Sequence, residues 1–247
     1  MITDIWFYVA AVPAVFFYGM GKGGVGGILG MLSVPLIAMT ISPLQAAAIL
    51  LPLLCIMDVM ALIYHRKHCN YRELKSMLPA ATIGVIIASF FMGSLPSTTV
   101  EWIIGGLALA FLGQKFLVQK APTNRPSQGY ALSMLSGFAS TIAHAGGPPA
   151  TMHLLPKTLP KEEYIATSVV FFAALNGMKL IPYAYLGELN ASNLTTSLVL
   201  IPIAFIGVRT GVWLVTIISQ QWIYRISYLV LLVTGVKMLV SGIFGSL

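Results

Sequence analysis

The sequence predicts an all-α polytopic membrane protein made of two inverted repeats, each a glycine-broken re-entrant helix hairpin followed by three transmembrane helices. Three observations lead to this prediction. Only 9% of the 247 residues are charged and 57% are hydrophobic, whereas soluble proteins average about 25% charged residues. Six apolar segments are long enough to cross a bilayer. Two further apolar segments are interrupted near their middle by glycine-rich stretches.

The composition also excludes several classes of function. The net charge of +7 comes from a shortage of acidic residues, 7 against 14 Lys and Arg, and not from a basic face, so we expect no nucleic-acid partner. Two cysteines cannot form a disulfide framework. The N-terminus lacks the basic segment and cleavage site of a secretory signal, so we expect the first apolar segment to be retained as structure.

The first repeat is expected at residues 1–120. It begins with a hairpin at 5–39, whose break runs from Gly19 to Gly27 and contains Lys22. An arm of about 14 residues reaches only ~21 Å as a helix, so each arm should cross just part of the ~30 Å hydrocarbon core. Three transmembrane helices follow, at 43–64, 76–95 and 100–118.

The second repeat is expected at residues 121–247, within one integral domain. Its hairpin covers 129–158, and the break there runs from His144 to Pro149. Three helices follow, at 164–186, 196–215 and 225–244. Gly23-Gly24 recurs as Gly146-Gly147, and Pro79 with Gly84 recurs as Pro202 with Gly207. This spacing favours a duplicated unit of about 120 residues, against the alternative of chance matches in an apolar chain.

The charges of the loops favour the re-entrant arrangement. Cytoplasmic loops collect Lys and Arg. If both broken segments are hairpins, all the basic loop residues lie on one side of the membrane and both termini are periplasmic. Eight kinked crossings with parallel halves would divide these charges between the two sides, and this alternative stays open. The basic loop residues are Arg66, Lys67, Arg72, Lys75, Lys120, Arg125, Lys157, Lys161 and Arg225.

The two breaks predict a polar site inside the membrane. Unwound backbone survives at membrane depth only where protein buries it or where it lines a water-filled cavity. A helix that resumes after a break offers free N–H groups and the positive end of its dipole, which favours an anion. The predicted substrate-binding residues of the breaks are Lys22, Gly23, Gly24, His144, Gly146 and Gly147.

Other polar residues within the apolar segments extend this prediction. Asn176 and Lys179 share a helix face and are expected to support substrate binding. Asp58 either neutralises a lysine or carries a coupling proton. His144 is the second coupling candidate, because histidine titrates near neutral pH. Two alternatives assign no substrate role: Lys22 extends to the membrane interface, and His144 only hydrogen-bonds between helices.

Several motifs resemble the sulfite exporter TauE/SafE family over essentially the whole chain. The resemblance implies a bacterial inner-membrane transporter of duplicated architecture, with members assigned to sulfite, organosulfonates and related anions. Lys22 stands where many relatives carry a small or apolar residue, so the substrate need not be sulfite itself. The motifs are Gly21-Lys22-Gly23-Gly24-Val25-Gly26-Gly27, Val34-Pro35-Leu36, Ser42-Pro43, His144-Ala145-Gly146-Gly147-Pro148-Pro149 and Asn176-Gly177-Met178-Lys179-Leu180-Ile181-Pro182-Tyr183.

We therefore expect a multi-pass secondary transporter that moves a small, sulfur-containing anion across the inner membrane by alternating access, with proton coupling as a hypothesis. An anion channel would use the same charges, and a membrane-embedded enzyme is the less favoured alternative. We expect no catalytic residue, cofactor or metal, since His65-x-x-His68 lies in a basic loop. The expected partners are the anion and the lipid bilayer, and a homodimer is compatible with the chain.

Overall fold

A computed structural model describes residues 1–25, 33–38, 40–92 and 126–219, together with residue 30 and isolated positions at 94–113 and 221–240. The regular structure of these residues is entirely helical, which confirms the predicted all-α class. The helices expected at 100–118 and 225–244 lie outside the described residues, apart from isolated positions.

The long helices divide between the two halves of the chain. The first half contains α1 (Ile5–Met20), a π-helical turn (Gly21–Val25), α2 (Ser33–Ile37), α3 (Pro43–His65), a 3-10 turn (Arg66–His68) and α4 (Tyr71–Phe91). The second half contains α6 (Pro126–Ala143), α7 (Gly147–Leu154), a 3-10 turn (Leu155–Lys157), α8 (Lys161–Tyr185) and α9 (Ala191–Ile217).

Five helical stretches in the described residues are long and apolar enough to cross a membrane. Large hydrophobic side chains such as Phe90, Ile181 and Trp213 are exposed on their outer faces, where lipid would cover them. The protein is therefore a multi-pass membrane protein. The five stretches are Ile5–Val25, Leu44–His68, Tyr71–Phe91, Lys161–Tyr185 and Ala191–Ile217.

Some helices begin earlier than hydropathy places them, because side chains cap them. The helix expected from residue 76 begins at Tyr71, since the side chain of Asn70 accepts a hydrogen bond from the Glu73 amide. The helix expected from 196 begins at Ala191, where Asn190 accepts from the Asn193 amide.

The first glycine-rich stretch stays helical for longer than expected. Helix α1 continues through a π-helical turn to Val25, and its backbone leaves helical geometry at Gly24, which has φ of 122°. Close packing against α9 explains this, since a Cβ atom added at Gly23 would lie 2.4 Å from the Val208 carbonyl oxygen. The first arm therefore spans 21 residues, which is longer than the arm of about 14 residues expected from the sequence and long enough to cross the hydrocarbon core.

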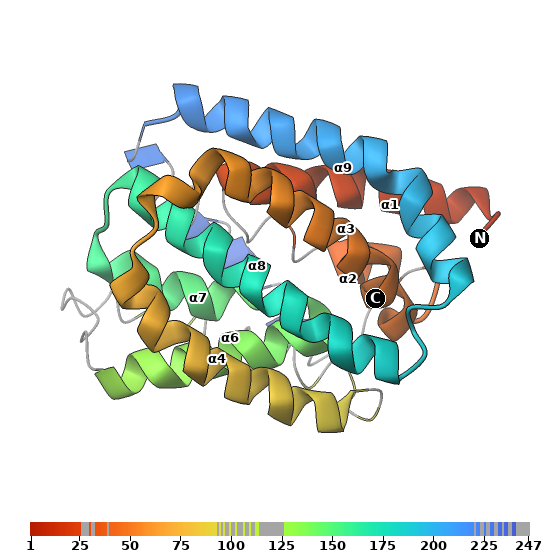
Figure 1. Ribbon diagram of the computed structural model, residues 1–247, viewed down its shortest axis with the longest axis horizontal. Helices are drawn as coiled ribbons and strands as arrows, with labels where there is room; N and C mark the ends of the chain where they lie inside the picture. The colour runs from red at the N-terminus through yellow and green to blue at the C-terminus, as the bar shows by residue number, and fades with distance from the viewer. Residues whose placement is uncertain are drawn as a thin grey trace.

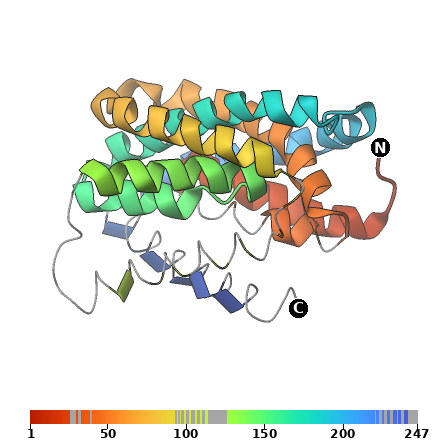
Figure 2. The same cartoon turned by 90° about the horizontal axis from the view of Figure 1, so that it is seen from below.

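Two pairs of helices pack side by side, α1 with α9 and α4 with α6 (Figures 1 and 2). Glycines make the close approach possible in both pairs: a Cβ atom at Gly84 would lie 1.9 Å from the Met134 carbonyl oxygen, and one at Gly207 would lie 2.5 Å from that of Phe16. Helices α3 and α8 contact each other and lie between the two pairs (Figure 1).

Both glycine-broken segments reverse direction. Helix α2 returns beside α1, since the Ser33 hydroxyl donates to the Ala14 carbonyl at 2.8 Å and Gly30 lies against the ring of Tyr18. Helix α7 returns beside α6, with the Ser136 hydroxyl donating to the Gly146 carbonyl at 2.7 Å and Gly129 against the ring of His153. The Tyr18–Gly30 contact lies closer to the first tip than the Ser33–Ala14 contact. The Ser136–Gly146 contact likewise lies closer to the second tip than the Gly129–His153 contact, so the two arms of each segment are antiparallel.

Candidate functional site

The tips of the two broken segments meet inside the helix bundle. The Tyr18 hydroxyl, one turn before Lys22, donates to the His144 carbonyl at 3.5 Å. Gly21, Lys22 and Gly24 of the first tip also line the same pocket as Gly147 of the second. The fold thus brings together two segments that lie 126 residues apart in the chain at this contact.

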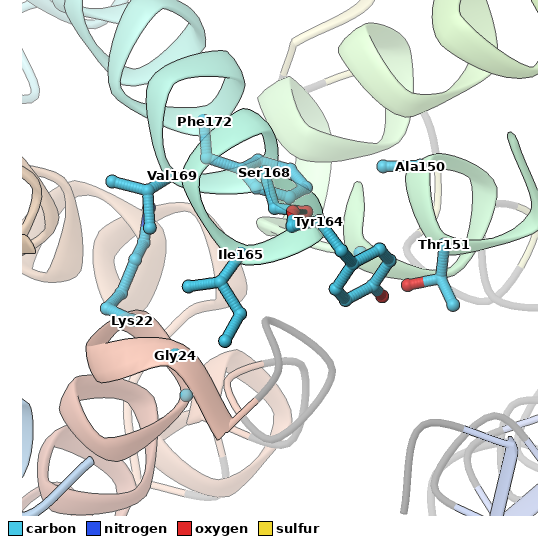
Figure 3. A pocket seen from close by; sticks show the side chains of 11 residues that line it. Lys22, Gly24, Ala150, Thr151, Tyr164, Ile165, Ser168, Val169 and Phe172 are labelled. Carbon is cyan, nitrogen blue, oxygen red and sulfur yellow. Dashed lines mark hydrogen bonds between the residues drawn. The ribbon is translucent and has the colours of Figure 1, made fainter. Parts of the chain in front are cut away.

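The pocket is a small crevice, partly open to solvent, with a cavity volume of about 30 Å³. Helices α7 and α8 provide the rest of its lining, and Tyr164 points across it toward Thr151 (Figure 3). The ammonium of Lys22 lies 5.3 Å from the ring centroid of Phe172. Lys22 is the one charged side chain among the described residues of the lining: Gly21, Lys22, Gly24, Gly147, Ala150, Thr151, Tyr164, Ile165, Ser168, Val169 and Phe172.

Lys22 belongs to a buried polar network that extends away from the pocket. Its ammonium donates to Oδ1 of Asp58 at 2.5 Å. The Asn176 side-chain amide donates to Oδ2 of the same carboxylate, also at 2.5 Å. All three side chains are buried. Asp58 therefore neutralises Lys22 and uses both of its oxygens, which buried charges require.

A second buried network surrounds Lys179, one turn further along α8. Its amino group lies 3.1 Å from the Ser140 carbonyl oxygen, 3.0 Å from the Ser140 hydroxyl and 2.8 Å from Nδ1 of His144. Nε2 of His144 lies 2.9 Å from the Ala47 carbonyl oxygen, and the ring stacks on Tyr183. Lys179 and His144 are both buried, and their contact joins α8 to the break between α6 and α7.

Glycines shape the remaining contacts of the breaks. The Gly23 carbonyl accepts a hydrogen bond from Nε2 of His65 at 2.9 Å. A Cβ atom on Gly146 would lie 2.6 Å from the Ser136 carbonyl oxygen, so only glycine fits there. Because Pro148 has no N–H, the amides of Gly146 and Gly147 are the donors that this turn can offer to a ligand. Residues 26–29, which follow the first break, lie outside the described residues.

Three contributors to these networks were not predicted from the sequence: Tyr18, Ser140 and Tyr183. Each lies four residues, one helical turn, from a residue that was singled out. Tyr18 precedes Lys22, Ser140 precedes His144 and Tyr183 follows Lys179. The hydroxyl of Tyr183 donates to the Thr141 carbonyl at 2.9 Å. Helical spacing from the predicted residues was therefore the available signal.

Long apolar helices around a buried charged network, reached by a pocket, define a polytopic membrane protein with an internal polar site. The family model of the sulfite exporter TauE/SafE matches residues 11–238, nearly the whole chain. The protein belongs to the TauE/SafE family, a family of membrane transporters, which suggests transport of a sulfur-containing anion. Comparisons with curated proteins and with solved structures found no match.

Proposed function

We propose that the protein is a secondary transporter that moves a small sulfur-containing anion, such as sulfite or an organosulfonate, across the bacterial inner membrane by alternating access. The observation that carries this proposal is the pocket that ends at Lys22 and takes its walls from both halves of the chain. An ammonium group within a membrane-spanning helix is costly, and such residues are retained mainly for function. An anion in the pocket would meet this ammonium and the first turn of α7, where Gly147 lies.

The helix pairs support an architecture of two inverted repeats. Met1, which precedes α1, contacts Ser192 at the start of α9. Gly23 and Gly211 lie together near the other ends of these helices, so α1 and α9 are parallel. Helices α4 and α6 are also parallel, since Tyr71 and Tyr130 share a groove near their starts. The first helix of each half thus packs against the last long described helix of the other half, α1 against α9 and α6 against α4. A two-fold relation between repeats would produce this exchange, and the antiparallel arms support the hairpins.

The basic residues support an inward-facing orientation of the pocket. Lys157 pairs with Glu73 at 2.8 Å, and Lys161 donates to the Val215 carbonyl at 3.1 Å. The described basic turns at 66–75 and 157–161 therefore lie at one end of the bundle. By the positive-inside rule this end is cytoplasmic, and the N-terminus at the other end is periplasmic. The pocket reaches Tyr164 in the first turn of α8, so it opens toward the cytoplasmic end.

The ion pair of Lys22 with Asp58 offers a route to proton coupling. An anion that binds the Lys22 ammonium competes with the Asp58 carboxylate for it. A carboxylate that loses its buried cationic partner is strongly destabilised, and taking up a proton removes that cost. Protonation of Asp58 would then belong to a later step of the transport cycle, after the anion has bound while Asp58 is ionised and paired with Lys22. His144, whose carbonyl contacts Tyr18, lies beside the same path and is the second group able to accept a proton.

Flux into proteoliposomes tests the proposal. A Lys22→Met variant should lose anion flux by roughly tenfold or more, because a charged hydrogen bond contributes about 1.5–3 kcal/mol. Lys75→Met is the matched control, since Lys75 is exposed at the basic end and its loss should leave flux unchanged. Counter-flow exchange of labelled anion distinguishes a transporter from a channel. Undiminished flux in Lys22→Met would remove the pocket from the transport path.

A further inference from the structure

The buried network contains more positive than negative charge. Lys22 and Asp58 cancel each other in their ion pair. Lys179 is fully buried, and in the part of the chain that the structure describes no carboxylate lies within ion-pair distance of it. Asn176 bonds to Asp58, and Lys179 follows three residues later on the same helix face. The extra cation therefore lies about one helical turn from the ion pair.

The hydrogen-bond geometry fits one set of protonation states. Nε2 of His144 faces a carbonyl oxygen, which can only accept, so this nitrogen carries the ring hydrogen. Nδ1 is then the acceptor for Lys179, and His144 is neutral. Lys179 faces three acceptors, two of them on Ser140, which match the three hydrogens of an ammonium. The network of Lys22, Asp58, His144 and Lys179 thus carries a net charge of one positive unit.

We propose that this single excess positive charge makes the site selective for monoanions, such as sulfonates and hydrogen sulfite, over tetrahedral dianions such as sulfate. This inference rests on the proposed function, because it takes the pocket at Lys22 as the substrate-binding site. A bound monoanion brings the buried charge to zero. A bound dianion leaves one uncompensated negative charge in a medium of low dielectric constant, where such a charge is costly. Asp58 sets the preference, because its carboxylate cancels one of the two lysines.

Three probes of nearly equal size and shape isolate the effect of charge. Dimethyl sulfone is neutral, methanesulfonate carries one negative charge and sulfate carries two, and none of them titrates near neutral pH. Binding to purified protein in detergent, at constant ionic strength, gives a dissociation constant for each. For the wild-type protein we expect methanesulfonate to bind roughly tenfold or more tightly than sulfate.

Three variants change the charge of the network in known steps. Asp58→Asn raises it to two positive units, and sulfate should then bind more tightly than methanesulfonate. The double variant with Lys22→Met and Asp58→Asn returns the network to one positive unit and should restore the preference for methanesulfonate. Lys179→Met keeps the Lys22–Asp58 pair but lowers the network to zero, so the advantage of methanesulfonate over dimethyl sulfone should disappear.

The outcomes separate the two proposals. If the wild-type protein binds and transports both anions equally, or if Asp58→Asn leaves their order unchanged, the charge rule is wrong and the transporter proposal stands. If the wild-type protein neither binds nor transports any of the anions, the proposed function itself fails. Lys179→Met keeps the test decisive if an Asp58 variant does not fold, since an unchanged preference for methanesulfonate in Lys179→Met also overturns the rule.

Discussion

Lys179 contacts His144 at 2.8 Å, although the two residues lie 35 positions apart in the chain. His144 reaches this contact with φ of 52°, a left-handed conformation that costs about 1–3 kcal/mol in residues other than glycine. The backbone at the second break therefore stores strain at the point where its side chain meets a buried lysine. Strained backbone of this kind clusters at functional sites.

Replacing His144 by Asn should preserve the break better than replacing it by Val. Asn adopts left-handed backbone readily, whereas a β-branched residue is an outlier there. We expect His144→Val to lower the free energy of unfolding by about 1–3 kcal/mol more than His144→Asn does. Denaturation in detergent micelles measures the difference. Equal losses for the two variants would show that backbone strain at this position is negligible.

The Lys22–Asp58 pair should be strongly coupled in stability. Asp58→Ala leaves the buried Lys22 ammonium without its partner, and breaking a buried pair in this way costs about 3–5 kcal/mol. The double variant with Lys22→Met and Asp58→Ala removes both charges and should lose much less. A double-mutant cycle of unfolding free energies gives the coupling. Losses that simply add would contradict the ion pair.

Two glycines in long helices should respond in opposite directions to alanine. At Gly84 the new Cβ atom would overlap the Met134 backbone of α6, so Gly84→Ala should destabilise the protein by about 1–3 kcal/mol. At Gly177, within α8, the new atom meets nothing within 4 Å. Gly177→Ala should therefore be neutral or stabilising by up to ~1 kcal/mol, because alanine favours the helix. Equal losses at the two positions would show that overlap with α6 is not the cause of the loss at Gly84.

Hydropathy was sufficient to predict the helical class, since crossing segments must be apolar whatever their packing. It could not place helix ends, because charged residues such as Arg72 and Lys75 lower the local hydropathy inside the first turns of α4. The caps at Asn70 and Asn190 decide those ends. The length of α1 depends on packing against α9, and single-sequence patterns contain no information on that partner.

The candidate site, like the fold, was only partly predictable from the sequence. Lys22, Asp58 and Lys179 attracted attention because charged residues are rare in apolar segments. Which of them would pair was not predictable, since hydropathy does not fix the rotation of one helix against another. Ser140 and Tyr183 are common residue types in membrane helices and gave no compositional signal, so their roles emerged only from the contacts with Lys179 and Thr141.

Cys69 provides a test of the orientation. It follows the basic turn after α3, at the end that we propose to be cytoplasmic, and is half-buried. In a Cys55→Ser background a membrane-impermeant maleimide should label Cys69 in inverted vesicles and not in intact cells. Burial raises the pKa of the Cys69 thiol above its ordinary value of 9.0. Because the thiolate is the reactive form, labelling should be slow at neutral pH and should still accelerate as the pH rises above 9.0.

A cysteine at the opposite end of the bundle completes this test. Ser192 is exposed at the start of α9 and accepts a hydrogen bond from the N-terminal amine of Met1. In a background without Cys55 and Cys69, Ser192→Cys should label in intact cells and be protected in inverted vesicles. The reverse pattern at both positions would place the basic end in the periplasm. The pocket at Lys22 would then open outward, and the positive-inside argument for an inward-facing state would be wrong.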